Sequence, residues 1–122
     1  HLALDGHRVM YFEPSLRCQQ YASEVFQSNG VAVSSIEKLD DIQPSSLDGV
    51  VCLDVLEHVS QPESLVKLFH SWLKPDGLLF VHAPSGPSIG LDRHTFGKID
   101  IYQKLQSPKG GLLHKFINHS NY

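Results

Sequence analysis

Three residues able to bind a metal ion or move a proton lie close together in the middle of the chain. Asp54, Glu57 and His58 have the spacing D-x-x-E-H, and side chains three or four residues apart share one face of a helical turn. Two carboxylates and an imidazole placed in this way could hold a hard cation. His82 and His94, the other candidate ligands, have no spacing that supports such a site. The residue types therefore permit a metal site here, but their spacing alone does not establish one.

Other reactive side chains form no complete catalytic arrangement. His82 could act as a general base, because an imidazole can take up a proton near neutral pH. It lies within the apolar run LLFVHA, which favours a structural histidine in the core or at a strand end. Cys52 is expected to be a small core residue, and Cys18 to lie on a helix with no base beside it. The S-G-P-S sequence at residues 85–88 is not the G-x-S-x-G nucleophile elbow, so no catalytic residue is assigned.

Strand and helix signals alternate along the chain and must position these side chains. Short β-prone runs are bounded by turn residues, and two stretches carry apolar residues at helical spacing. The predicted order is strand 8–12, helix 16–28 between Ser15 and Asn29-Gly30, strand 31–35, polar loop 37–48, strand 49–53, a helix from 60–63 to the turn at 74–77, and strand 78–83. Such alternation predicts an α/β fold with parallel strands and right-handed crossovers.

Some segments carry more specific expectations. The run GVVCL at 49–53 is almost entirely apolar, as expected of a central strand that is buried on both faces. The sequence S-Q-P-E at 60–63 has the form of a capping box, in which the serine side chain would begin the helix. Beyond residue 90 the signals weaken. Residues 99–105 could form a helix, and the K-G-G sequence at 109–111 would break whatever precedes it.

Length and composition limit the class of protein. The 122 residues suffice for one domain, and 41% hydrophobic and 19% charged residues are ordinary for a globular protein. A net charge of -3 argues against binding of nucleic acid by bulk positive charge. Two distant cysteines exclude a disulfide scaffold and a zinc ribbon. No apolar run approaches the roughly 18 residues of a membrane span and no signal peptide is recognisable, so we expect a cytoplasmic location.

The carboxyl ends of the predicted strands hold the candidate binding residues, because ligands of open parallel sheets bind beyond those ends. The end residues are Glu13, then Ser35, Ile36 and Glu37, then Leu53 and Asp54, and then residues 82–85. Glu13 is the most informative. A carboxylate only accepts hydrogen bonds, so Glu13 could take two from a ribose diol. From its position alone, Glu13 could equally be a solvated residue at the end of a strand.

Three blocks of the sequence resemble class I S-adenosylmethionine-dependent methyltransferases, in the order found in that family. They are G-H-R-V to E-P-S at 6–15, D-G-V-V-C-L-D-V-L-E-H-V at 48–59, and L-K-P-D-G-L-L-F-V at 73–81. The resemblance covers about residues 2–83. It implies an α/β, Rossmann-like three-layer sandwich with a mostly parallel sheet. It also implies S-adenosylmethionine as the cofactor and in-line transfer of its methyl group to an oxygen, nitrogen or carbon atom.

The resemblance also assigns roles to the residues at the strand ends. Glu13 matches the acid that holds the ribose hydroxyls of the cofactor. Ser35, Ile36 and Glu37 match the region that flanks the adenine, whereas Leu53 and Asp54 match the turn that lies against the cofactor. Pro84 and Ser85 fall where many members of the family face the substrate.

The family comparison also bears on the metal question. Small-RNA ribose methyltransferases use a similar E-x-x-E-H pattern to hold magnesium or manganese. The L-E-H-V segment is nevertheless common in members without a metal, where it caps a turn and packs. We therefore expect no metal at Asp54, Glu57 and His58.

Parts of the family pattern are missing from the sequence. The first strand and the glycine-rich loop would precede residue 1, and no sixth or seventh strand is recognisable. The resemblance therefore implies a fragment that contains strands two to five and their helices. We expect a partial methyltransferase core at 1–90 and a poorly defined segment of the same domain at 91–122. Without the glycine-rich loop, the isolated chain is expected to bind the cofactor weakly or not at all.

The resulting hypothesis is methyl transfer to a small-molecule acceptor, with no nucleic acid as a partner. The sequence lacks the Asn-Pro-Pro-aromatic motif with which related enzymes hold the amino groups of bases and glutamine. A nicotinamide-dependent Rossmann oxidoreductase is an alternative, because Glu13 would likewise hold a ribose, but no Y-x-x-x-K pair is present. A non-catalytic scaffold that keeps the methyltransferase sheet is a further alternative. The acceptor, the catalytic base and the oligomeric state are left open.

Overall fold

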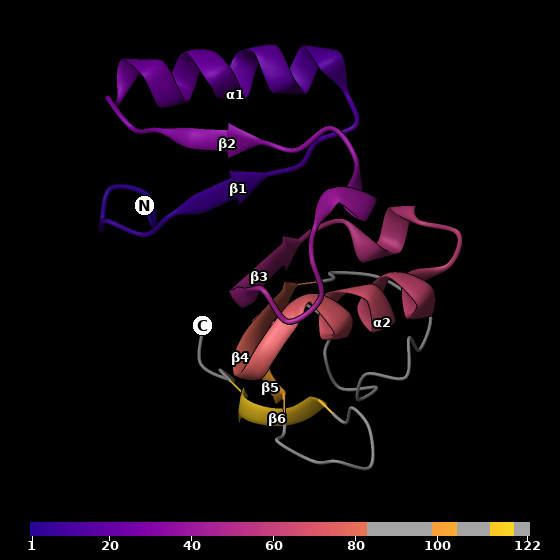
Figure 1. The fold of residues 1–122 in the computed structure, drawn as a ribbon. Coiled ribbons are helices and arrows are strands. Elements are labelled where there is room, and N and C mark those ends of the chain that lie inside the picture. Colours follow the sequence, from indigo (N-terminus) through magenta and orange to yellow (C-terminus); the bar gives the residue numbers. More distant parts are fainter. Residues whose placement is uncertain (83–98, 105–112, 119–122) are drawn as a thin grey trace. The chain divides into compact units, whose positions relative to one another are not determined.

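A computed structural model describes residues 1–82, 99–104 and 113–118 of the chain (Figure 1). The chain forms two compact units, residues 1–42 and residues 43–122. Each unit is an α/β arrangement with its own sheet, and each is described by itself below.

The first unit is a strand–helix–strand arrangement with a short helical turn. It contains β1 (Val9–Tyr11), α1 (Leu16–Ser28), β2 (Val33–Ser35) and the 3-10 turn η1 (Leu39–Asp41). The two strands are parallel and in register from Val9 opposite Val33 to Tyr11 opposite Ser35. Figure 1 shows α1 running alongside this strand pair. The predicted strand–helix–strand order of this region is confirmed.

Local signals explain where α1 begins and ends. The side chain of Ser15 accepts a hydrogen bond from the backbone N–H of Cys18, as an N-cap does. Asn29 is the C-cap, and Gly30 follows with a φ of +64°, a left-handed conformation that glycine adopts without steric penalty. Phe26 on α1 meets Tyr11 on β1 edge to face, with ring centroids 5.5 Å apart. This aromatic contact packs α1 against β1.

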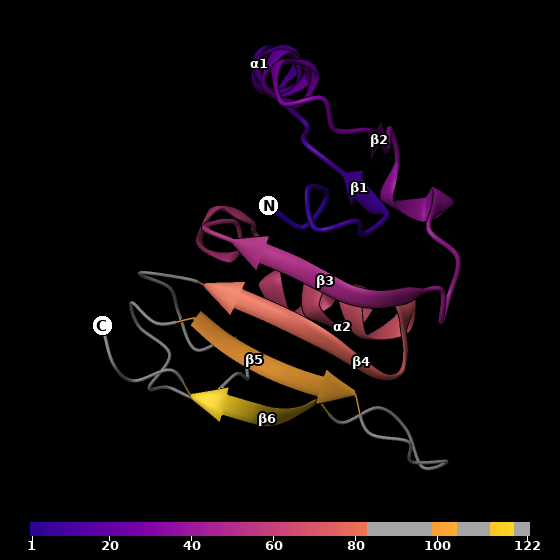
Figure 2. The same cartoon turned by 90° about the vertical axis from the view of Figure 1, so that its left-hand side faces the viewer.

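The second unit is a four-stranded sheet with one long helix. Its strands lie in the order β3-β4-β5-β6, and α2 covers one face of the sheet (Figure 2). Strands β3 and β4 are parallel, whereas β4 and β5, and β5 and β6, are antiparallel. The elements are β3 (Leu47–Leu53), η2 (Leu56–His58), α2 (Pro62–Trp72), β4 (Leu73–His82), β5 (Ile99–Lys104) and β6 (Leu113–Asn118).

The core of this unit lies between α2 and the sheet. Phe69 and Trp72 of α2 are buried, with ring centroids 5.6 Å apart. They lie on the stripe that the sequence predicts to be core. The strand residues that alternate toward the same side include Cys52, Leu79 and Val81, all of which are buried.

The expectation that β3 is buried on both faces is wrong in this structure. Cys52 is buried, but the neighbouring Val51 and Leu53 are 50% and 45% exposed. Successive side chains of a strand point to opposite faces, and α2 covers only one face of this sheet. Within the described part of the chain, β3 is also an edge strand, with only β4 as its neighbour.

The start of α2 also differs from the prediction. The N-cap is Gln61, which makes no side-chain capping bond, and Pro62 is the first helical residue. A proline keeps the residue before it out of the helical region, so the helix cannot extend back to Ser60. The predicted capping box is therefore absent, although Glu63 still lies in the positively polarised first turn.

Strand β4 begins earlier than expected because its predicted entry turn is built into the ladder as a bulge. Leu73 already pairs with Leu47, and the next pair joins Leu78 to Gly49. Residues 74–77 therefore bulge out opposite Asp48 alone. Lys74 Nζ closes this bulge with a 2.9 Å ion pair to Asp48 Oδ1.

The C-terminal part of the chain corrects two further expectations. Residues 99–104 form β5 rather than a helix, because they pair antiparallel with β4 along its length. Strand β6 then extends the sheet, so two strands follow β4 where none was recognised. Lys104 Nζ donates to the carbonyl oxygens of His70 at 3.0 Å and Leu73 at 2.7 Å, which ties β5 to the end of α2.

Two predictions from the sequence concern residues outside the ranges that the structure describes. The loop at 85–88 and the predicted break at 109–111 lie outside the described residues. The division of the domain at residue 90 stays a prediction. No helix in the described ranges is long and apolar enough to cross a membrane.

Candidate functional site

Four of the predicted cofactor-binding residues lie at one edge of the first unit. Glu13 follows β1, and Ser35, Ile36 and Glu37 end and follow β2. Because the strands are parallel with Tyr11 opposite Ser35, their carboxyl ends lie side by side. The backbone N–H of Ile36 donates to the carbonyl oxygen of Tyr11 at 2.9 Å, so the pairing continues past the end of β2.

Glu13 is held in place by the beginning of α1. Its Oε1 accepts a 2.9 Å hydrogen bond from the backbone N–H of Ser15, and its carbonyl oxygen accepts one from the side chain of Gln19. Among the described residues, nothing hydrogen-bonds to Oε2. One carboxylate oxygen is therefore used to position the side chain, and the second can accept a hydrogen bond from a ligand.

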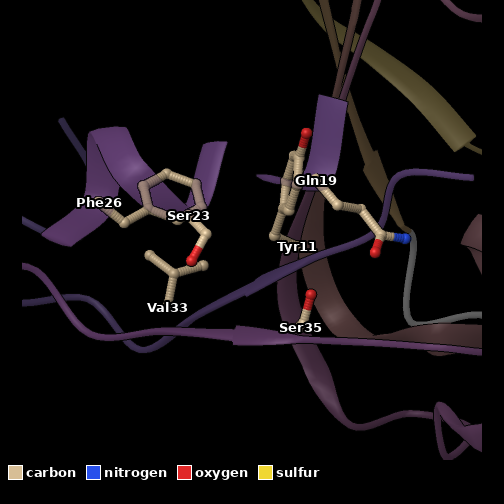
Figure 3. Close-up of a pocket in the computed structure, with 6 residues that line it drawn as sticks. All are labelled: Tyr11, Gln19, Ser23, Phe26, Val33 and Ser35. Carbon is tan, nitrogen blue, oxygen red and sulfur yellow. The ribbon is translucent and has the colours of Figure 1, made fainter. Parts of the chain in front are cut away.

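A small pocket lies behind this edge, between α1 and the two strands (Figure 3). Its volume is about 80 Å³, well below the roughly 300 Å³ at which small-molecule pockets begin. Burial raises the pKa of the Tyr11 phenol, and the charge of Glu13 adds to that shift. We interpret the pocket as a packing gap. Its lining residues are Tyr11, Gln19, Ser23, Phe26, Val33 and Ser35.

The other two predicted cofactor-binding residues lie at one edge of the second unit. Leu53 ends β3 and pairs with His82, which ends β4. Asp54 follows, and its backbone N–H donates to the carbonyl oxygen of His82 at 2.9 Å. The Asp54 carboxylate is also paired with the imidazole, with Oδ1 2.5 Å from Nδ1.

The pairing of Asp54 with His82 is the feature that the sequence did not reveal. The favoured interpretation of His82 as a strand-end histidine is correct as to its position, but its partner was not identified. Two signals could have found that partner. Both residues come at the carboxyl ends of predicted strands, and strands joined by a helical crossover are commonly neighbours in a parallel sheet.

The remaining members of the D-x-x-E-H sequence do not converge with Asp54. His58 is exposed, whereas the Glu57 side chain is only 8% exposed and its Oε2 has no hydrogen-bond partner in the described structure. In the ranges that the structure describes, no group of three histidine, cysteine, aspartate or glutamate residues could hold a metal ion. Burial raises the pKa of the Cys52 thiol to about 11, with a further contribution from Glu57.

The structure thus divides the six predicted cofactor-binding residues between its two units. Four lie at the carboxyl ends of β1 and β2, and two at the carboxyl ends of β3 and β4. Pro84 and Ser85, predicted to face a substrate, lie outside the described residues.

The fold and the position of these residues define the class of protein. Parallel strands joined by helices, with polar side chains gathered beyond the carboxyl ends, are typical of Rossmann-like α/β proteins that bind nucleotide cofactors. The family model described as a methyltransferase domain matches residues 1–81. The chain therefore belongs to the methyltransferase domain family.

Individual relatives agree with this assignment. Over 46 residues the chain is 50% identical to the ubiquinone biosynthesis O-methyltransferase of Idiomarina loihiensis, a match that covers 38% of this chain and 19% of that protein. The chain spans about a fifth of the length of the curated relatives it matches.

Solved structures of low sequence identity share the fold. The [4+2]-cyclase SpnF superposes with a TM-score of 0.62 at 18% identity, over 67% of this chain and 33% of that one. The PH0226 protein of Pyrococcus horikoshii also has a TM-score of 0.62, at 16% identity, over 94% of this chain and 60% of that one. These matches support the Rossmann-like α/β fold. The family match does not favour the nicotinamide-dependent alternative.

Proposed function

We propose that the protein containing this chain transfers a methyl group from S-adenosylmethionine to a small-molecule acceptor. The family membership supports methyl transfer as the reaction class. When bound, the cofactor supplies a methyl group attached to a positively charged sulfur. An acceptor atom can attack the methyl carbon in line with the carbon–sulfur bond and displace the sulfur. The residues of this chain would contribute by holding the reactants in that geometry, which is a large part of catalysis in two-substrate reactions.

The conformation of Glu13 is the observation that carries this proposal. Its carboxylate is fixed through one oxygen, Oε1, and the described residues leave the other oxygen without a hydrogen bond. A carboxylate in this state fits a ribose diol, which needs an acceptor that is already oriented. Glu13 also ends a strand of a parallel pair, where such ligands bind.

The other predicted residues are also proposed as cofactor contacts, each considered within its own unit. Ser35, Ile36 and Glu37 would flank the adenine, and the half-buried Ile36 offers an apolar surface to it. Leu53 and Asp54 would lie against the cofactor at the end of β3. Leu53 is half exposed there, as a contact residue must be.

The acceptor class and the location of the protein are further parts of the proposal. A relative named as an O-methyltransferase supports a small molecule that is methylated on oxygen. A small-molecule acceptor and the absence of a membrane-spanning helix from the described ranges are compatible with a cytoplasmic enzyme. Residues 1–90 would form part of the methyltransferase core, and residues 91–122 a further segment of the same domain.

Glu13→Gln in the full-length protein tests the proposal. A hydrogen bond to a charged group contributes roughly 1.5–3 kcal/mol, so we expect the dissociation constant for S-adenosylhomocysteine, measured by calorimetry, to rise about tenfold or more. Glutamine keeps an acceptor oxygen for the Ser15 N–H, so the free energy of unfolding should change little. Glu24→Gln, an exposed change on α1, is the matched control. Equal affinities of the Glu13 and Glu24 variants would contradict the role of Glu13.

A further inference from the structure

The carboxyl ends of β3 and β4 carry an aspartate–histidine pair with a defined geometry. Asp54 Oδ1 lies 2.5 Å from His82 Nδ1, and the backbone N–H of Asp54 donates to the carbonyl oxygen of His82 at 2.9 Å. The two residues are thus joined twice, through main chain and side chain. The second bond fixes the rotation of the imidazole ring, because it holds one ring nitrogen toward the carboxylate.

The backbone of Asp54 adopts an uncommon conformation directly after β3. Its φ is +55°, in the left-handed region, which residues other than glycine adopt rarely and aspartate more often than most. Such conformations are concentrated at functional sites, where the surroundings hold them in place. The pair is also accessible, because the side chain of Asp54 is 60% exposed and that of His82 is 25% exposed.

We propose that His82 is the base that takes the proton from a hydroxyl group of the methyl acceptor, and that Asp54 positions it. This inference rests on the proposed methyl-transfer function. With Nδ1–H donated to the Asp54 carboxylate, the lone pair of Nε2 is the proton acceptor. The carboxylate then stabilises the imidazolium that forms, which is the part an aspartate plays toward a histidine in hydrolases.

The step balances without a further reactant. The O–H bond of the acceptor breaks, and its proton moves to His82 Nε2. The acceptor oxygen uses its lone pair to form a bond to the methyl carbon as the carbon–sulfur bond of the sulfonium donor breaks. The electron pair of the broken carbon–sulfur bond stays on sulfur, so the donor becomes a neutral thioether.

The Asp54–His82 pair also indicates which class of methyl acceptor would need a general base. A neutral alcohol or phenol is a weak nucleophile near neutral pH, so removal of its proton during the reaction accelerates transfer. An aromatic thiol is largely ionised already and gains little from a base. The Asp54–His82 pair therefore favours a hydroxyl acceptor over an aromatic thiol.

The tautomer of His82 tests the pair without any assay of activity. In full-length protein with isotope-labelled histidine, the nitrogen shifts of each imidazole report which nitrogen carries the proton. For neutral His82 we expect the proton on Nδ1, whereas Asp54→Ala should move it largely to Nε2. A wild-type His82 protonated on Nε2 would overturn the proposal, because no lone pair would then be available there.

Methylation of two probes tests the acceptor class. With S-adenosylmethionine as donor, we expect His82→Gln to slow methylation of catechol about a hundredfold or more and that of benzenethiol less than threefold. His7→Gln, an exposed change, is the control. Equal losses on both probes would indicate a structural role and sink the proposal, as would an unchanged catechol rate.

A third measurement separates this proposal from the proposed function. Calorimetric titration of the full-length protein with S-adenosylhomocysteine should show the same affinity for wild type and His82→Gln, since His82 acts on the acceptor. Absence of binding to the wild type would contradict the methyltransferase function itself. Binding combined with the Nε2 tautomer would contradict only the role of His82.

Discussion

Neighbouring residues at the end of β3 differ in how far water reaches them. Cys52 is buried, whereas Leu53 and Asp54 are exposed at the strand end. Strand alternation explains the contrast between Cys52 and Leu53, because adjacent side chains point to opposite faces. A short stretch of sequence thus supplies both an inert core residue and the residues proposed to face ligands.

The burial of Cys52 leads to a prediction for thiol reactivity. Because its pKa is raised to about 11, Cys52 has almost no thiolate at neutral pH and should not react with a disulfide reagent. Exposed Cys18 should react readily. We expect one fast thiol per native chain and two in denaturant, measured by absorbance of the released chromophore. Rapid reaction of a Cys18→Ser variant would contradict the burial of Cys52.

The same shift has a consequence for stability. Between the ordinary value of 9.0 and about 11 the unfolded chain loses the Cys52 proton while the folded chain keeps it. The folded state then binds more protons, so this residue makes the free energy of unfolding fall as the pH rises through that range. A Cys52→Ala variant should lack this component of the pH dependence.

At the scale of the elements, the bulge at the start of β4 depends on a glycine. A Cβ atom at Gly77 would lie 2.9 Å from the Lys74 carbonyl oxygen and 3.0 Å from Cδ2 of buried Leu73. We expect Gly77→Ala to lower the free energy of unfolding by roughly 1–3 kcal/mol, measured with urea. Gly49→Ala is the matched control, because its Cβ would meet only the Leu78 carbonyl oxygen at 3.5 Å. Equal losses in both variants would contradict this account of the bulge.

The two long helices begin in different ways, which predicts different responses to serine replacement. Ser15 accepts a hydrogen bond from Cys18 N–H, so Ser15→Ala should lower the free energy of unfolding by about 0.5–1 kcal/mol. Ser60 lies before the N-cap of α2, so Ser60→Ala should change the free energy of unfolding by less than about 0.5 kcal/mol. Urea unfolding followed by circular dichroism measures both. A larger loss of unfolding free energy for Ser60→Ala would show that Ser60 caps α2, and would contradict the absence of the capping box.

Sequence reasoning succeeded where local signals decide the structure and failed where pairing decides it. Helix α1 and the strands β1 to β4 follow from caps, prolines and apolar runs, although their ends shift by a few residues. Residues 99–104 are too short for a stable isolated helix, and pairing with β4 makes them a strand. The Asp54–His82 pair likewise depends on the register of β3 and β4, which no single segment encodes.

For the whole molecule, family membership says more than the fold. The same architecture is found in SpnF, a protein named as a cyclase, so the fold by itself does not establish methyl transfer. The match of the methyltransferase domain over residues 1–81 assigns the family. The proposed roles then fall to strand-end residues, with Glu13 binding the cofactor and the Asp54–His82 pair removing a proton from the acceptor.

The central claim is that this protein uses S-adenosylmethionine, and cofactor binding tests it most directly. Full-length protein would be titrated by calorimetry with S-adenosylhomocysteine and, separately, with oxidised nicotinamide adenine dinucleotide. We expect a dissociation constant in the micromolar range for the first, corresponding to about -8 kcal/mol, and no measurable heat from the second. Binding of the dinucleotide alone, or of neither compound, would contradict the assignment.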